Sequence, residues 1–162
     1  MIRLAALPLL LSACAQAPAR DETAALSVRA EGTGIEVRGE HFRATFDRTA
    51  GGQITKLRLS DGEEGIALKD PGAAGGFPEI ALRDGTREYG TGLDRGATLE
   101  VRESGPGGVV LESVSVLSAQ DGTASPWTAR TTTEIFPEGA VFVELELELR
   151  EGTFDLQAAS AR

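Results

Sequence analysis

The sequence predicts an all-β fold, an antiparallel β-sandwich of about ten strands. Beyond the first residues of the 162-residue chain, no segment repeats apolar side chains at the helical period. Short runs instead alternate apolar and polar residues, as strands with one buried face do. Turn-forming residues, among them 20 glycines and 7 prolines, separate these runs. Regular short strands joined by such turns are typical of sandwiches and barrels.

Each expected strand lies between two of these turns. Its bounds follow from where the alternation starts and where the next Gly, Pro or Asp cluster interrupts it. In chain order the strands are Leu26–Glu31, Gly34–Arg38, His41–Asp47, Gln53–Leu59, Gly65–Lys69, Glu79–Arg83, Ala97–Arg102, Val109–Ser118, Trp127–Phe136 and Val141–Arg150, with a last piece near Phe154–Ala158. We assign them to one domain, residues 25–162.

The segment Trp127–Arg150 predicts a β-hairpin with a defined register. Its second arm carries Val and Leu on one face and mainly Glu on the other. The tripeptide Pro137–Gly139 suits a three-residue loop, with Pro in a type I turn and Gly at positive φ. A two-residue loop would turn Glu134 toward the buried face, which is unfavourable. The expected pairs are Phe136 with Ala140, Ile135 with Val141, Thr133 with Val143, Ala129 with Leu147, Trp127 with Leu149, Thr132 with Glu144, and Arg130 with Glu146.

The polar face of this arm carries Glu144, Glu146 and Glu148. Same-face neighbours on a strand are about 6.8 Å apart, so two carboxylates could share a calcium ion but a third would need further help. We therefore expect a solvated outer face, with Arg130 as a cross-strand partner, and no metal site.

The first fourteen residues have the parts of a bacterial export signal. Arg3 precedes the apolar segment Leu4–Leu11, which is too short to span a bilayer as a helix. The sequence Leu11-Ser12-Ala13-Cys14 then resembles the lipobox of bacterial lipoproteins. The resemblance implies removal of residues 1–13, acylation of Cys14 and a tether over residues 14–24. The alternative is an ordinary secretory signal in which Cys14 is incidental.

This export signal and lipobox imply a cell-envelope protein that is held in the membrane by its N-terminal lipid. Ala15 follows Cys14, and in families with a sorting rule at that position this resembles delivery to the outer membrane, facing the periplasm or the surface. Cys14 is the only cysteine, so we expect the domain to fold without disulfides. The chain carries 25 acidic against 16 basic residues, which argues against a nucleic-acid partner.

The segment His41–Gly62 predicts a second hairpin. Phe42, Ala44 and Phe46 share one face, and Gly51-Gly52 leads into a strand with an Ile-x-x-Leu pattern. This resembles the opening hairpin of galactose-mutarotase-like β-supersandwich domains, which occur in sugar mutarotases, polysaccharide lyases and glycosidases. The resemblance implies a supersandwich-like fold and a carbohydrate ligand. Those domains are longer than this chain, which would then be a fragment or a reduced sandwich.

No catalytic residue can be assigned from these patterns. Active mutarotases use several histidines, whereas His41 is the single histidine here and lacks the surrounding motifs. No Gly-x-Ser-x-Gly element provides a hydrolase nucleophile, and no Cys or His cluster suits zinc. Paired carboxylates for glycoside hydrolysis remain open, because their separation cannot be read from the sequence.

Tyr89 and Trp127 are the candidate carbohydrate contacts, since aromatic faces stack on sugars. The hairpin register assigns Trp127 to the apolar face, whereas Tyr89 lies in a glycine-flanked loop and is the more accessible of the two. Three functions stay open, and no cofactor is expected. The first is a non-catalytic carbohydrate-binding lipoprotein. The second is a structural or assembly lipoprotein that binds another envelope protein through a sheet edge or an apolar patch. The third is a fragment of a polysaccharide lyase or glycosidase.

Overall fold

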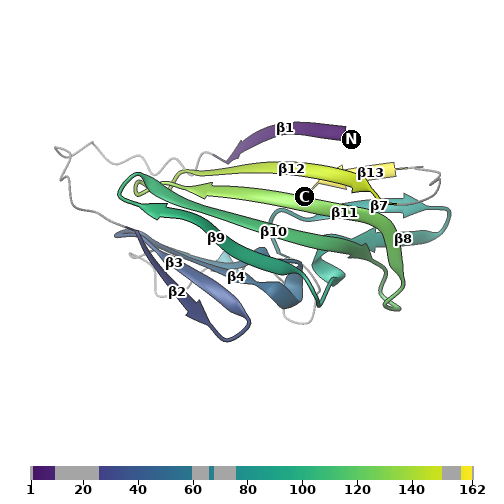
Figure 1. The fold of residues 1–162 in the computed structure, drawn as a ribbon, viewed down its shortest axis with the longest axis horizontal. Helices are drawn as coiled ribbons and strands as arrows, with labels where there is room; N and C mark the ends of the chain where they lie inside the picture. Colours follow the sequence, from purple (N-terminus) through teal and green to yellow (C-terminus); the bar gives the residue numbers. More distant parts are fainter. Residues whose placement is uncertain (1, 10–25, 60–65, 68–75, 151–157, 162) are drawn as a thin grey trace.

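The protein is an antiparallel β-sandwich in which two sheets pack face to face (Figure 1). The computed structural model describes residues 2–9, 26–59, 66–67, 76–150 and 158–161. These ranges form thirteen strands and two short 3-10 helices, and every strand pair is antiparallel. The predicted all-β sandwich is therefore confirmed.

The smaller sheet has five strands in the order β2-β3-β4-β5-β6. Its bounds are β2 Ser27–Glu31, β3 Gly34–Arg38, β4 Phe42–Asp47, β5 Gln53–Leu59 and β6 Ile66–Ala67. Phe42, Ala44 and Phe46 are buried, as their alternation predicts. The register of β4 on β5 shifts between the pairs Thr45/Lys56 and Phe46/Ile54. The extra residue, Thr55, lets both Ile54 and Leu57 face the core although three positions separate them.

The larger sheet has eight strands and provides most of the length of the molecule (Figure 1). Its order is β1-β12-β11-β10-β8-β7-β13, and β9 pairs with β10 beside β8. The bounds are β1 Ile2–Leu9, β7 Ile80–Asp84, β8 Arg87–Gly90, β9 Thr98–Gly105, β10 Gly108–Ser118, β11 Ala124–Ile135, β12 Val141–Leu149 and β13 Ala158–Ala161.

The predicted register of the β11–β12 hairpin is confirmed at every pair. Ile135 lies opposite Val141, and the remaining expected pairs follow without a shift down to Trp127 opposite Leu149. At the loop, Phe136 N–H donates to Ala140 O at 2.9 Å, and Gly139 adopts a φ of 87°. The loop length therefore sets which side chains enter the core.

Two apolar clusters form the core, both on the inner face of the larger sheet. The first joins the two sheets: Phe42, Phe46 and Ile54 of the smaller sheet pack with residues such as Leu111 and Ile135 of the larger one. The second contains residues of the larger sheet alone, from β7, β8, β10, β11 and β12, and from Ala119 just after β10. Figure 1 shows β7 and β8 at the opposite end from the smaller sheet. The larger sheet thus covers its own inner face at that end.

The Gly51-Gly52 turn is where the smaller sheet meets the larger one between these clusters. It follows the 3-10 helix η1 (Arg48–Ala50), which packs on a second one, η2 (Thr91–Leu93). Both glycines have positive φ, 69° and 73°. A Cβ on Gly51 would collide with the Thr91 carbonyl, and one on Gly52 with the Ser113 side chain. The glycine pair is therefore explained by backbone conformation and close packing.

Some sequence expectations need correction. The stretch around Tyr89, expected to be a loop, contains the strand β8. Ile2–Leu9, within the expected export signal, forms β1 on the edge of β12 in this structure of the whole chain. β11 begins at Ala124, earlier than expected, and β9 extends to Gly105. Cys14, the tether and residues 154–157 lie outside the described residues.

Candidate functional site

The two aromatic residues proposed as carbohydrate contacts lie together inside the protein. Tyr89 is 7% exposed and Trp127 is 8% exposed, and both belong to the second core cluster. The expectation that Trp127 faces the core is confirmed, whereas the expectation that Tyr89 is the more accessible residue is wrong. The reason is that β8 pairs with β7 and turns Tyr89 inward. Neither ring offers an open face for stacking on a sugar.

The polar end of Tyr89 has a structural role. Its hydrogen bond to Arg87 raises the pKa of that guanidinium, with a further contribution from Asp121. Arg87 Nη2 lies 3.3 Å from Asp121 Oδ2. The pKa of Asp121 is lowered first by its hydrogen bonds to Thr123. This network joins β8 to the turn between β10 and β11.

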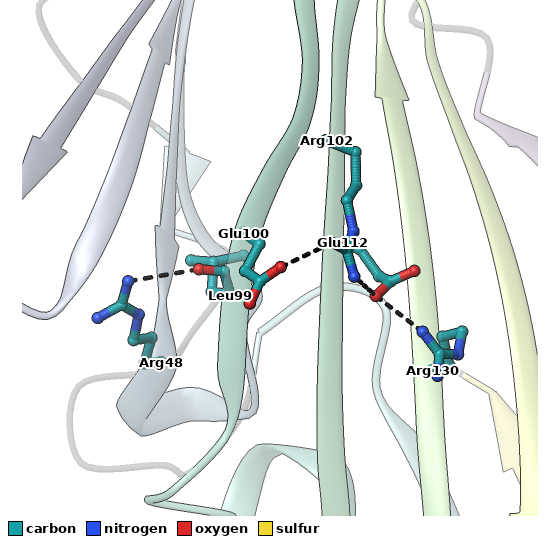
Figure 2. Close-up of polar contacts among 6 residues, drawn as sticks. All are labelled: Arg48, Leu99, Glu100, Arg102, Glu112 and Arg130. Atoms are coloured by element: carbon teal, nitrogen blue, oxygen red, sulfur yellow. Dashed lines mark hydrogen bonds and ion pairs between the residues drawn. The ribbon is translucent and has the colours of Figure 1, made fainter.

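The outer face of the larger sheet carries an ordered charge cluster, which we call the Glu112 cluster: Glu100, Arg102, Glu112 and Arg130 (Figure 2). Glu112 Oε1 accepts from Arg102 Nη2 at 2.5 Å and lies 2.7 Å from Arg130 Nη1. Arg102 also reaches Glu100 at 2.8 Å. The hydrogen bond from Arg102, followed by that from Arg130, lowers the pKa of the partly buried Glu112. Three strands, β9, β10 and β11, are tied together by this cluster.

Beside the Glu112 cluster, the outer face of β12 is acidic and partly apolar. Glu144 and Glu148 are exposed, and within the described ranges neither makes an ion pair. Phe142 is 41% exposed and meets Phe136 edge to face, with ring centroids 5.7 Å apart. The outer face of β12 thus presents one exposed aromatic ring beside a row of carboxylates.

The edge of β12 that faces away from β11 carries β1. The pairing runs from Ile2 opposite Leu147 to Leu9 opposite Val141, and it is antiparallel. One irregularity falls between Leu4 and Leu7, so that two residues of β1 face Glu144. This edge of β12, which we call the β12 edge, therefore accommodates an added strand along most of its length.

The backbone groups available at the β12 edge follow from the hairpin. Arg150 N–H donates to Pro126 O at 2.9 Å, toward β11. Donors to one neighbour come from alternate residues of an antiparallel strand, so even-numbered residues of β12 bond to β11. The N–H groups of Val143, Leu145 and Leu147 consequently point to the β12 edge.

Although its outward positions carry Glu144, Glu146 and Glu148, the β12 edge lacks the bulges, prolines and inward charges that usually protect a sheet edge. β12 is nine residues long, its register on β11 has no shift, and its inward positions carry no charged residue or proline. By contrast β9, on the other side of β10, has a shift near Val101 and the outward or bulged charges Glu100, Arg102 and Glu103. The edge strand β2 is short and contains Arg29 and Glu31. Of these three strands, β12 has the longest regular run of backbone groups available to a neighbouring strand.

Sequence reasoning missed the Glu112 cluster, and it considered a sheet edge as a binding surface without identifying β12 as that edge. The signal for the edge was present, because an alternating strand with purely apolar inward positions stands out in the printed sequence. The cluster carried no such signal, since it needs β9 beside β10, a pairing that the expected strands did not specify.

The remaining sequence candidates stay apart from this surface. His41 is exposed and lies 3.8 Å from Glu40. Across the described ranges, no three His, Cys, Asp or Glu side chains gather closely enough to hold a metal ion. Nor do these ranges contain an apolar helix of membrane-spanning length.

Comparisons with known proteins add no family assignment. No family model matches the chain, and no curated protein matches it significantly.

Proposed function

We propose that this chain is a non-catalytic binding domain of the bacterial cell envelope, anchored through an acylated Cys14, that captures a partner protein by strand addition at the β12 edge. In this mode an extended segment of the partner adds a strand to an exposed sheet edge, and backbone hydrogen bonds supply much of the affinity. The observation that carries the proposal is the antiparallel strand seated on the unprotected β12 edge, drawn from residues that the lipobox predicts to be removed.

Cleavage at the lipobox would leave the β12 edge without β1 in the processed chain. If residues 1–13 are cleaved, the backbone N–H groups of Val143, Leu145 and Leu147 lose the neighbouring strand that β1 supplies. The apolar side chains along the inner face of β12 also lose their cover on that side. A regular edge of this length is prone to uncontrolled pairing. A strand from a partner protein would accept hydrogen bonds from these N–H groups and would cover the apolar side chains at the edge.

For the carbohydrate-binding alternative, the two candidate aromatic contacts, Tyr89 and Trp127, are buried in the core. The Gly51-Gly52 turn, which carried part of the resemblance to supersandwich domains, is accounted for by its packing on η2 and Ser113. A glycan array on the purified chain tests this alternative, and retention on a polysaccharide would restore it.

Two measurements on the native protein test the proposal. The mass of the N-terminal peptide is expected to show an acylated Cys14, and Cys14→Ser to release the chain from membranes. A photo-crosslinking amino acid at Phe142, beside the β12 edge, is expected to give one stoichiometric adduct whose crosslink maps to an extended segment of the partner. The same probe at Val101, an exposed apolar position on β9, is the control.

Each measurement has a contradicting result. A mature chain that keeps Ile2–Leu9 would leave the β12 edge occupied and would overturn the proposal. So would equal crosslinking from Phe142 and Val101, because the adduct would then not depend on the edge.

A further inference from the structure

The chemistry of the β12 edge defines the kind of segment that it can accept. This inference rests on the proposed function and specifies the partner. Inward positions of β12 carry Val and Leu, so the segment needs apolar residues opposite them. Outward positions carry Glu144 and Glu146, followed by the exposed Phe142. A residue opposite each of these shares its face of the sheet.

We infer that the β12 edge selects an antiparallel segment of a partner protein that alternates apolar residues with Arg or Lys, the basic residues facing Glu144 and Glu146 and an apolar residue facing Phe142. Opposite charges at directly opposed positions stabilise a strand pair, and like charges destabilise it. Exposed charges near the edge also raise the rate of encounter with a basic segment.

The segment seated on the edge in this structure follows this pattern opposite Glu146 and Phe142, whereas Glu144 faces the irregularity at Ala5 and Ala6. Arg3 lies opposite Glu146, Leu4 opposite Leu145, and Pro8 opposite Phe142. The basic residue of β1 thus occupies a register position opposite a glutamate, and leucines occupy positions opposite the apolar residues. β1 therefore gives the antiparallel direction of the occupant and its residue types opposite Glu146, Phe142 and the apolar positions, and a second basic residue opposite Glu144 would add to this pairing.

A second copy of the chain fits the edge poorly. Two β12 strands in antiparallel pairing, centred on Leu145, would bring Glu144 opposite Glu146 of the other copy. Shifting the register by one residue would place glutamates opposite leucines and turn charges toward the apolar side. Both arrangements are unfavourable, so the charge pattern favours a different, basic partner.

The test uses the chain purified from the envelope in its natural processed form and three labelled, end-blocked peptides. Each peptide has eight residues, like β1. The first has Val at alternate positions, Thr between them, and Arg at the two positions that face Glu144 and Glu146. The second replaces both Arg by Glu. The third keeps Arg but carries N-methyl groups on the ladder-forming amides.

We expect the Arg peptide to bind about tenfold more tightly than the Glu peptide at about 20 mM salt, because two favourable pairs replace two repulsive ones. The difference should shrink at about 500 mM salt, where exposed charges are screened. Glu144→Gln and Glu146→Gln should each weaken binding of the Arg peptide severalfold. Glu103→Gln, an equal charge change on β9, should leave binding unchanged. N-methylation should abolish it.

The outcomes separate this inference from the proposed function. Equal binding of Arg and Glu peptides, still abolished by N-methylation, would overturn the charge selection and leave strand addition standing. Failure of all three peptides to bind would overturn both. Binding that survives N-methylation would also overturn both, since it would reflect attraction between charges without a strand.

Discussion

Arg130 on β11 pairs with Glu112 on β10, with Nη1 2.7 Å from Oε1, although it lies directly opposite Glu146 on β12 in the hairpin register. In the β10–β11 ladder, Arg130 is opposite Val114 and Glu112 is opposite Thr132, so this is a diagonal pair. Arg102 approaches the same carboxylate oxygen from β9. The two guanidiniums explain why the pKa of Glu112 lies below its ordinary value.

The first prediction concerns Glu112→Gln. We expect the free energy of unfolding at pH 7 to fall by about 1 kcal/mol, because a partly buried carboxylate loses its charged donors and two guanidiniums lose their acceptor. Since the folded pKa is lowered, the stabilisation is fully present above the unfolded pKa and is lost as pH falls through the folded value. Urea unfolding of both proteins from about pH 7 to about pH 2.5 should therefore show their difference vanish in acid.

Glu100→Gln is the matched control, since among the described residues Glu100 forms an ion pair only with Arg102, and it is well exposed. Its effect should stay within about 0.5 kcal/mol. A pH-independent difference for Glu112→Gln would show that packing, and not charge, is responsible.

The second prediction concerns the Gly51 position. Gly51→Ala should lower stability by about 3 kcal/mol, since it combines a left-handed backbone with a collision against the Thr91 carbonyl. Gly85→Ala has a similar φ, 58°, but open space around its Cβ, so it should cost only about 1 kcal/mol. Thermal unfolding of both variants checks this, and equal losses would refute the close contact between the two sheets.

The third prediction concerns Asp94, whose carboxylate accepts a backbone hydrogen bond from β10 where no neighbouring strand among the described residues does so. Its Oδ2 accepts from Val116 N–H at 2.8 Å, between the parts of β10 that pair with β9 and with β8. Its Oδ1 accepts from Gly96 N–H. Asp94→Asn keeps one acceptor and turns an amide donor toward the other N–H, which should cost about 1–2 kcal/mol. Hydrogen exchange at Val116 should accelerate, whereas Asp121→Asn, at an exposed turn, should leave that amide unchanged.

The fourth prediction separates folding from binding at Phe142. Phe142→Ser removes an exposed ring and its contact with Phe136, so stability should change by less than about 1 kcal/mol. Affinity for the Arg peptide should fall severalfold, because the ring borders the β12 edge. Val101→Ser, on β9, should leave affinity intact. Loss of affinity in both variants would argue against a site at β12.

The hairpin β11–β12 could be predicted in full because its register depends on local chemistry. The Pro137–Gly139 loop and the strict alternation of β12 together allow one pairing that keeps Glu134 out of the core. The bulge at Thr55 could not be predicted with the same certainty, since the Ile-x-x-Leu spacing of Ile54 and Leu57 also fits a helix turn.

Arrangements that depend on distant strands could not be predicted from the sequence. Tyr89 appeared accessible because glycines flank it, yet β7 and β10 both pair with β8 and bury it. Arg130 lies opposite Glu146, as the hairpin predicts. Its ion pair with Glu112 could not be predicted, because β10 contributes that residue from the other side of β11.

Amide hydrogen exchange of the chain in its natural processed form, with and without the Arg peptide, tests strand addition at β12 most directly. Added protection is expected at Val143, Leu145 and Leu147, whose N–H groups point to the edge, and not at Glu144 or Glu146, which already bond to β11. Protection confined to other strands, or absent from those three amides, would contradict the account.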